Sequence, residues 1–212
     1  MSLADLRRAY AKAELDERSV DRDPLKQLLA WLDEAQHAGV IEPNAMTLAT
    51  STPEGRPSAR IVLLKGADAR GLVFFTDSRS RKGLELAANP EAALVFWWAE
   101  LERQVRVCGS VEPIPSDQSD AYFRSRPEGS RLSAWVSHQS QVVKHRGALE
   151  TQWADAASRY ASGDIPRPPW WGGLRVRPSE YEFWQGRPNR LHDRIRYLWS
   201  DDGGWKLERL NP

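Results

Sequence analysis

The 212-residue sequence contains almost no cysteine and no long apolar run. Cys108 is its only cysteine, so an intramolecular disulfide is impossible and we expect a reducing, cytoplasmic setting. The alternating residues around Cys108 predict a strand, and with it a packed, unreactive thiol. No run of ~18 apolar residues is present to form a transmembrane helix. Residues 1–20 lack the apolar stretch of a secretory signal, so we expect no membrane association.

The net charge is also small: the sequence has 30 basic and 29 acidic residues, which gives +1. A chain with so little excess charge is not expected to bind nucleic acid. Lysine is scarce among the basic residues: six are lysine and 24 are arginine. Arginine forms bidentate bonds to phosphate and stacks on rings, so this excess suits phosphorylated ligands. A genome rich in arginine codons gives the same excess, so the inference must rest on particular arginines.

The motifs of several enzyme classes are missing as well. The histidines have no metal-ligand spacing such as HExxH, and a single cysteine cannot form a CxxC pair, so we expect no bound metal. No glycine-rich fingerprint for nucleotides and no G-x-S-x-G elbow is present.

The N-terminal part of the chain predicts helical structure. Residues 3–14 are predicted to form a short polar helix or an arm. Asp23 followed by Pro24 is typical of a helix start, and Gly39 is a plausible stop. Between them an apolar stripe recurs at helical spacing, formed by Leu25, Leu28, Leu29, Leu32 and Ala35.

From Ala45 onward the period of the pattern changes to two, which predicts strands joined by tight turns. The predicted strands are 45–50, 58–65, 72–76, 92–98, 103–114, 174–178, 181–185, 193–199 and 205–210. Helices are predicted at 80–88, 117–126 and 141–161, with a stiff proline connector at 165–169. These elements predict a mainly β fold with helices, an antiparallel barrel with helical additions. The segment after the connector is too short to stand alone, so we expect a single domain over 1–212.

Two groups of residues in the first half suit an anionic ligand. In the run 60–65, alternation places Lys65 on the more apolar face, although without other context a lysine there is expected to extend from the strand end into solvent. Phe75 and Thr76 precede Ser80, Arg81 and Lys82 at a predicted helix start, where free N–H groups and cations form an anion site. A solvated basic turn gives the same pattern.

The middle of the chain adds three further signals. Gln104, in a strand, can present a donor and an acceptor to the edge of a heterocycle. Tyr122 and Arg126 are four apart on one helix face, and Ser130 follows in the next turn, which suggests a phosphate clamp. Gln139 and Ser140 precede the helix predicted at 141–161, where Ser140 is a natural N-cap.

The most informative segment runs from Tyr181 to Arg194, with the sequence YEFWQGRPNRLHDR. Three arginines, one histidine and one aspartate lie there close to Trp184. Arginine and histidine bind phosphate and move protons, and a large aromatic offers a flat surface for a planar ring. The segment therefore suits an anionic aromatic ligand, although surface strands also carry arginine often.

These groups, in this order, resemble the pyridoxamine 5'-phosphate oxidase family over nearly the whole chain. The resemblance rests on RIVLLK (60–65), SRK (80–82), LERQV (101–105), FRSRP (123–127), AWVSHQS (134–140), WWGG (170–173) and the C-terminal EFWQG and RLHDR. It implies an FMN-binding split β-barrel, a homodimer, and FMN bound where the subunits meet. It also implies oxidation of pyridoxamine 5'-phosphate or pyridoxine 5'-phosphate to pyridoxal 5'-phosphate, with dioxygen reduced to hydrogen peroxide.

The resemblance carries roles onto individual residues. The FMN site would comprise Arg60, Ile61, Val62, Lys65, Phe75, Thr76, Arg81, Lys82, Gln104, Gln139, Ser140, Trp184 and Arg194. The substrate site would comprise Arg7, Arg8, Tyr10, Lys65, Tyr122, Arg126, Ser130, Arg190, Leu191 and His192. Arg190 and His192 would be the catalytic pair at the substrate's pyridine. Arg7, Arg8 and Tyr10 would belong to an N-terminal arm, within residues 1–20, that closes over the site; Ala9 stands where an acidic residue is common.

Two other functions remain open. Another split-barrel flavoprotein would keep the cofactor contacts of Lys82 and Gln104 but would not need Tyr122, Arg126 and Ser130 together with RLHDR. A non-catalytic carrier of pyridoxal phosphate would need no flavin.

Overall fold

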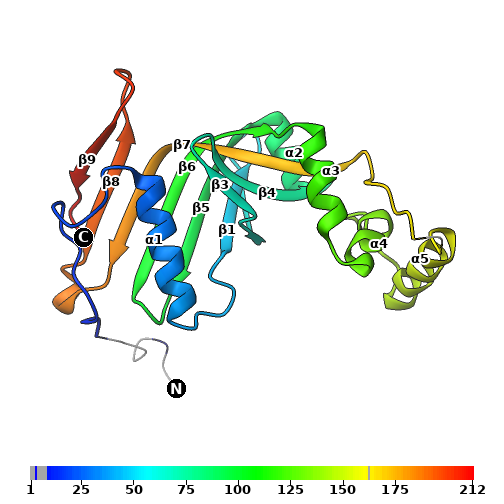
Figure 1. Ribbon diagram of the computed structural model, residues 1–212, viewed down its shortest axis with the longest axis horizontal. Helices are drawn as coiled ribbons and strands as arrows, with labels where there is room; N and C mark the ends of the chain where they lie inside the picture. The colour runs from blue at the N-terminus through cyan, green and yellow to red at the C-terminus, as the bar shows by residue number, and fades with distance from the viewer. Residues whose placement is uncertain (1–2, 4–8, 162) are drawn as a thin grey trace.

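The computed structural model describes residue 3 and residues 9–161 and 163–212. Over these residues the chain forms five α-helices and nine strands (Figure 1). The helices are α1 (Pro24–His37), α2 (Arg81–Ala88), α3 (Ser116–Ser125), α4 (Glu128–Val136) and α5 (Arg146–Arg159). The strands are β1 (Ala45–Ser51), β2 (Pro57–Leu63), β3 (Gly66–Asp68), β4 (Gly71–Asp77), β5 (Glu91–Trp98), β6 (Arg103–Pro113), β7 (Trp171–Gln185), β8 (Asp193–Trp199) and β9 (Trp205–Arg209).

All strands pair antiparallel in one sheet of order β2-β1-β5-β6-β7-β4-β3, and β8 and β9 extend it from β7. The sheet curls (Figure 1), and the Lys65 backbone N–H, between β2 and β3, donates to the Val73 carbonyl of β4 at 2.8 Å. Alternation along the central strands buries one face, which includes Leu48, Phe96 and Val105. This is the mainly β, partly open barrel with helical additions that the sequence predicts.

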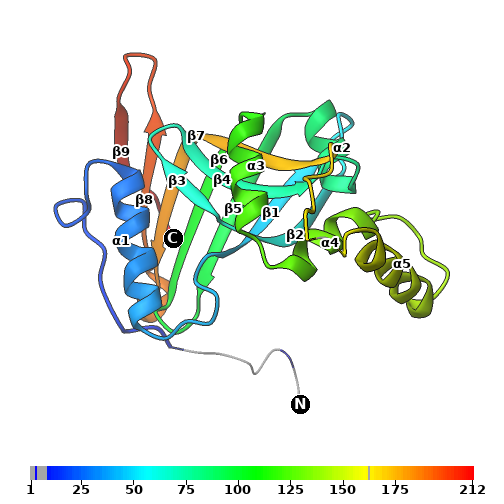
Figure 2. The ribbon, with the colours of Figure 1, turned by 45° about the vertical axis from the view of Figure 1, so that its right-hand side comes forward.

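Helix α1 covers one face of the sheet (Figure 2). It begins as predicted, since the Asp23 carboxylate accepts a hydrogen bond from the Leu25 N–H at 2.9 Å and Pro24 follows as the first helical residue. Trp31 on its buried stripe contacts Phe183 edge-on, with ring centroids 5.2 Å apart. The amphipathic stripe therefore becomes part of the main core.

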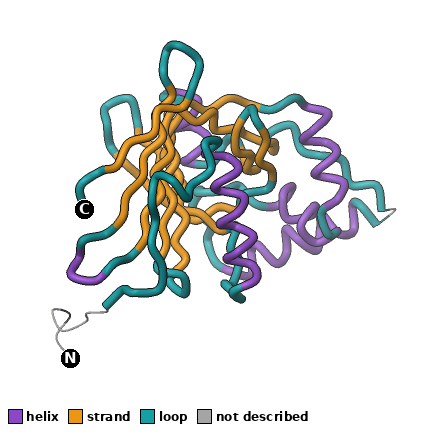
Figure 3. Tube along the Cα trace, turned by 60° about the vertical axis from the view of Figure 1, so that its left-hand side comes forward, coloured by secondary structure: helices purple, strands orange, loops and turns teal. Residues whose placement is uncertain are grey.

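A second apolar cluster joins α3, α4 and α5 to the start of β7. Its buried members are Phe123, Leu132, Ala134, Ala156, Ile165 and Trp171. These helices lie at the opposite end of the molecule from β8 and β9 (Figure 1), and Figure 3 shows the same arrangement from another side. The fold thus has one end built from helices and another built from the C-terminal hairpin, and β7 runs between them.

Three expectations about elements are wrong. The strands predicted at 174–178 and 181–185 are one strand, β7, because pairing with β6 continues through an irregularity at Cys108 and Gly109. The helix predicted at 141–161 begins only at Arg146, where the His145 ring accepts from the Ala148 N–H. Ser130, expected in a turn after Pro127, lies in a helix, α4.

The N-terminal prediction is resolved only in part. Residues 9–14 are not helical, which favours the arm over the helix, and residues 4–8 lie outside the described part of the chain. Within the described residues, no helix is long and apolar enough to cross a membrane, and no group of three or more metal-binding side chains is found.

Candidate functional site

A cavity of about 570 Å³ lies between β2, β4 and α3. Eleven of the residues singled out from the sequence line it: Arg60, Ile61, Val62, Lys65, Phe75, Thr76, Lys82, Tyr122, Arg126, Ser130 and Gln139. A neighbouring cavity of about 470 Å³ shares Arg60, Lys82 and Gln139 with it and adds Arg81 and Ser140. We call these two cavities together the basic cavity.

Local structure explains why these side chains meet. Ser80 is the N-cap of α2 and accepts from the Gly83 N–H at 3.3 Å, which directs Arg81 and Lys82 from the first turn. Gly83 is needed there, because a Cβ atom would lie 2.4 Å from the Ser78 carbonyl oxygen. Ser140 is not the N-cap expected from the sequence; it lies in a turn at φ 70°.

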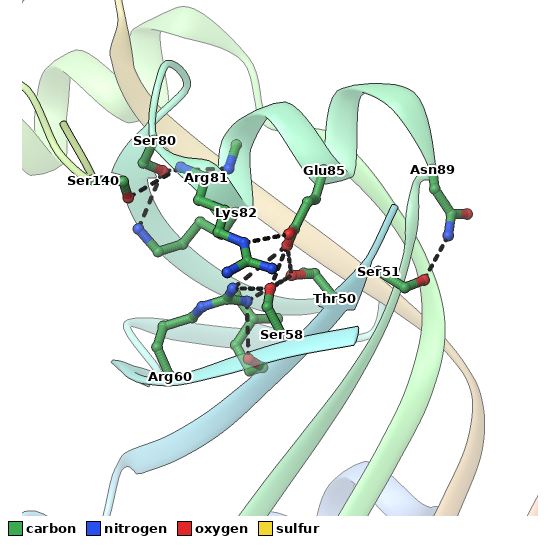
Figure 4. Close-up of polar contacts among 12 residues, drawn as sticks. Thr50, Ser51, Ser58, Arg60, Ser80, Arg81, Lys82, Glu85, Asn89 and Ser140 are labelled. Atoms are coloured by element: carbon green, nitrogen blue, oxygen red, sulfur yellow. Dashed lines mark hydrogen bonds and ion pairs between the residues drawn. The ribbon is translucent and has the colours of Figure 1, made fainter. Parts of the chain in front are cut away.

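Lys82 donates hydrogen bonds to three neutral oxygen atoms, and Figure 4 shows the one to Ser80. Its Nζ donates to Thr76 Oγ1 at 3.0 Å, Gln139 Oε1 at 3.0 Å and Ser80 Oγ at 3.2 Å. Among the described residues no carboxylate forms an ion pair with it. Burial, and then the nearby Arg60, lower the pKa of Lys82. A bound anion would supply the missing opposite charge.

A buried carboxylate holds the two neighbouring arginines in place. Glu85 accepts from Thr50, Ser58 and Arg81, and its Oε2 is 3.5 Å from Arg60 Nη2 (Figure 4). Burial alone would raise the pKa of Glu85, but these hydrogen bonds and the charge of Arg81 lower it to about 2. Glu85 was not among the residues predicted from the sequence; its spacing of four from Arg81 on a helix was the available signal.

The other end of the basic cavity is walled by three stacked rings. Tyr122 lies on Phe75 with centroids 4.0 Å apart, and Phe75 lies on Trp171 at 5.2 Å, with nearly parallel planes. The Arg126 guanidinium lies 4.6 Å from the centroid of the Trp171 ring. Trp171 was not predicted as a site residue. WWGG is one of the motifs that carry the resemblance, but the resemblance gave no role to its individual residues.

Arg126 has an unsatisfied donor in this cavity. Its Nη1 is buried and has no hydrogen-bond partner in the described part of the chain. Burial lowers the pKa of Arg126, and Tyr122 opposes this change. An unpaired, buried guanidinium nitrogen is costly, so the arrangement fits a ligand that brings acceptor oxygens.

The remaining predicted residues gather around the end of β7. Gln104 on β6 and Arg194 on β8 both pair with Trp184 on β7, so the three lie side by side across the sheet. Arg194 is paired with Glu182 at 2.8 Å. The His192 ring is 4.7 Å from the Trp184 ring. We call this set, with the loop 187–193, the β7-end group.

The loop sets the proton position on His192. The Arg187 backbone N–H donates to His192 Nδ1 at 3.1 Å, so a neutral ring carries its proton on Nε2. Burial, and then the charge of Arg190, lower the pKa of His192, which favours this neutral form. Arg190 and Asn189 have positive φ of 63° and 56°, and Arg190 and Leu191 are exposed.

The N-terminal arm covers this loop. Tyr10 packs edge-on against Trp184 and His192, with centroids 5.7 and 5.8 Å apart. The Glu102 carboxylate accepts from the Ala11 and Lys12 N–H groups at 2.9 and 3.1 Å. Arg7 and Arg8, also assigned to the arm, lie outside the described residues.

The basic cavity and the β7-end group do not meet within one chain. Trp171, in the wall of the basic cavity, begins the 15-residue strand β7, and Trp184 lies near its end. Thirteen strand steps correspond to roughly 40 Å along the chain. None of the described residues of the β7-end group lines the basic cavity.

Comparison with known proteins relates the chain to one family. Residues 32–160 match the family model described as pyridoxamine 5'-phosphate oxidase, and residues 171–212 match that of the pyridoxine 5'-phosphate oxidase C-terminal dimerisation region. The pyridoxine/pyridoxamine 5'-phosphate oxidase of Nostoc punctiforme is 57% identical over 211 residues, covering 100% of this chain and 99% of that protein. The protein of the same name from Salinibacter ruber is also 57% identical, with 99% of each chain covered.

Solved structures show the same likeness. PhzG of Burkholderia lata, crystallised with tetrahydrophenazine-1-carboxylic acid, is 34% identical with a TM-score of 0.89, covering 96% of this chain and all of that one. A pyridoxamine 5'-phosphate oxidase-related, FMN-binding protein of Nostoc punctiforme is 22% identical with a TM-score of 0.72, covering 91% of this chain and all of that one. The second likeness concerns the fold alone, and with the curled sheet it confirms the split-barrel architecture.

Proposed function

This chain belongs to the pyridoxine/pyridoxamine 5'-phosphate oxidase family and is an oxidoreductase, and we propose that it uses FMN and dioxygen to make pyridoxal 5'-phosphate. The substrates would be pyridoxamine 5'-phosphate and pyridoxine 5'-phosphate, and hydrogen peroxide the second product. The amine substrate would also release ammonia.

The observation that carries the proposal is the composition of the basic cavity. It combines a lysine surrounded by neutral acceptors with an arginine whose buried Nη1 lacks a partner. Lys82 and Arg126 are thus two separate places for an anion in one cavity. Two phosphorylated molecules, the cofactor and the substrate, account for both.

The residues at the first place fit the phosphate end of FMN. Lys82, Arg81 and the hydroxyl of Thr76 would hold the phosphate, and the N-terminal turn of α2 adds backbone donors. Glu85 keeps Arg60 and Arg81 oriented, since it bonds to both side chains. FMN, when bound, supplies the redox chemistry by taking two electrons from the substrate and passing them to dioxygen.

The residues at the second place would bind the substrate. Arg126, Tyr122, Ser130 and Lys65 would hold its phosphate, and this remote contact would fix the position of the reacting carbon. Arg190 would orient the pyridine. His192, neutral with its proton on Nε2, would donate a hydrogen bond to the substrate or exchange a proton with it.

We further propose that the complete site forms between two copies of the chain. The basic cavity and the β7-end group lie at opposite ends of β7, so one copy cannot bring Arg126 and Arg190 to one small substrate. Each region also leaves an apolar side chain in solvent: Ile61 is 64% exposed and Trp97, beside Trp184, is 48% exposed. A homodimer that buries both would complete two equivalent sites.

An absorption spectrum of the purified protein tests the proposed function. We expect a flavin spectrum that bleaches when pyridoxamine 5'-phosphate is added without oxygen, and that returns with peroxide when air is admitted. A colourless protein that still binds pyridoxal phosphate would indicate the non-catalytic carrier. A flavin that does not bleach with either phosphorylated substrate would indicate a different split-barrel flavoprotein.

A further inference from the structure

Arg167 connects three segments of the chain at the back of the ring stack. It lies in the proline connector, and its side chain is 15% exposed. Its Nε donates to Asp120 Oδ1, its Nη1 to the Trp171 carbonyl and its Nη2 to Ser116 Oγ, each at 2.6 Å. One planar guanidinium therefore joins helix α3 to the first residue of β7.

These partners carry the parts of the proposed phosphate clamp. Helix α3 begins at Ser116 and carries Tyr122, and its C-cap is Arg126. Trp171, whose carbonyl Arg167 binds, provides the ring next to the Arg126 guanidinium. The angle between α3 and β7 thus sets where Arg126 points.

Arg167 does not share a cavity with the clamp. It lines a separate cavity of about 480 Å³ that also contains Ser116 and Ser119, and Trp171 borders both this cavity and the basic one. Thr76 also borders both cavities, but the hydrogen bonds of Arg167 go to α3 and to Trp171, so these connect it to the clamp.

A second contact keeps α3 attached without Arg167. Ser119 Oγ accepts from the Gly173 N–H at 3.1 Å, and Phe123 remains buried against Trp171. Loss of Arg167 should thus leave the helix docked but less well aligned. A variant at Arg167 should therefore change the alignment of α3 without unfolding the region.

We propose that Arg167 is a positioning residue for phosphate recognition, which orients Arg126 and Tyr122 by tying α3 to Trp171. The role rests on the proposed function, because it assumes that the clamp binds a phosphate. A lysine would fill this role only in part, since it has no planar fork with which to reach a carboxylate, a hydroxyl and a carbonyl together.

The test measures phosphate binding directly and turnover separately. Calorimetry with inorganic phosphate on the FMN-loaded protein should show about tenfold weaker binding for Arg167→Ala, since a misaligned Arg126 loses part of the strength of its charge-assisted hydrogen bond to phosphate. The phosphate affinity of Arg167→Lys should lie between those of the wild type and of Arg167→Ala. In steady state with pyridoxine 5'-phosphate, KM should rise by a similar factor while kcat and FMN affinity stay unchanged. Arg159→Ala, an exposed arginine of α5, is the matched control.

A double-mutant cycle identifies the route of the effect. If Arg167 acts through Arg126, then Arg167→Ala should add little to the loss already caused by Arg126→Ala. Unchanged phosphate binding in Arg167→Ala, fully additive losses, or a parallel fall in FMN affinity and kcat would each overturn the proposal. Phosphate binding needs no turnover, so an inactive wild-type protein would contradict the proposed oxidase function and leave this test intact.

Discussion

Lys82 is the residue whose surroundings most clearly suit a bound anion. Its ammonium group has three neutral acceptors and a pKa lowered by burial. An anion beside it would restore the pKa, because opposite charge favours the protonated form.

We expect Lys82→Ala to weaken FMN binding by about 10- to 150-fold, on the order of 1.5–3 kcal/mol for a lost charge-assisted bond. Fluorescence titration of the apo-protein with FMN measures this. Lys206→Ala, at an exposed position of β9, is the control and should bind FMN as the wild type does. Unchanged FMN affinity in Lys82→Ala would remove Lys82 from the cofactor site.

Glu85 makes the stability of the folded protein depend on pH in the acidic range. Its pKa is about 2 in the folded protein against an ordinary value of 4.5. The carboxylate therefore contributes stability that is fully present above pH 4.5 and is lost as the pH falls towards 2.

Glu85→Gln should lower the melting temperature at neutral pH and flatten its decline between pH 5 and pH 3. Glu91→Gln, at the exposed start of β5, should follow the wild-type curve. Parallel curves for wild type and Glu85→Gln would show that this carboxylate does not carry the acid sensitivity.

Replacing Arg126 and replacing Arg190 should change the kinetic constants differently if the two residues act at opposite ends of one substrate. Arg126→Ala should mainly raise KM, because a phosphate contact is similar in the ground and transition states. Arg190→Ala should lower kcat as well, because it displaces the reacting carbon. Peroxide production by FMN-saturated variants measures both effects. Wild-type kcat/KM in both variants would mean that the substrate site lies elsewhere.

At the scale of elements, the N-terminal arm and the loop 187–193 behave as one unit. Asp193 accepts from the Leu15 N–H at 3.1 Å, and Arg187 pairs with Glu14 at 2.6 Å. Gly186 permits the close approach of Tyr10, since a Cβ atom there would lie 2.7 Å from Tyr10 Cβ. The arm thus lies over His192 through contacts that a single methyl group would disturb.

Gly186→Ala should displace Tyr10 and expose the arm. We expect faster cleavage of residues 9–16 by a protease and a higher KM for pyridoxine 5'-phosphate, with FMN affinity unchanged. Gly204→Ala adds the same methyl group where no atom lies within 4 Å, and should change neither property. Equal cleavage rates in the two variants would mean that the contact at Gly186 does not hold the arm.

At the scale of the whole molecule, the separation of the two residue sets has a simple consequence for mixed dimers. If each site takes Arg126 from one subunit and Arg190 from the other, a hybrid of the two single variants contains one intact site and one doubly altered site. Random exchange makes about half of the dimers hybrids, with one working site of two.

Mixing Arg126→Ala with Arg190→Ala under subunit exchange should therefore restore about a quarter of wild-type kcat/KM. The unmixed variants, carried through the same exchange, are the controls. A mixture that shows only the mean of its two components would place the whole site in one subunit. Light scattering that gives a monomer with FMN bound would contradict the dimer itself.

Local pattern was enough to predict most elements and most of the basic cavity. Asp23 and Pro24 start a helix through contacts within a few residues, and the period of two in 45–50 and 92–98 follows from alternation in a strand. Ser80, Arg81 and Lys82 were found because a helix N-terminus and its cations are adjacent in the sequence. Such features depend on short-range geometry, which the sequence alone determines.

Only the tertiary structure decided the features that join distant segments. Glu85 reaches Arg60 and Thr50 because α2 packs on β1 and β2, and Trp171 reaches Tyr122 because β7 begins beneath α3. Ser140 lost its expected capping role because the chain stays irregular up to His145. The distance between Arg126 and Arg190 also depends on β7 being one continuous strand, and this followed from its pairing with β6. Contacts between residues far apart in sequence depend on how the sheet curls, and no local pattern encodes that.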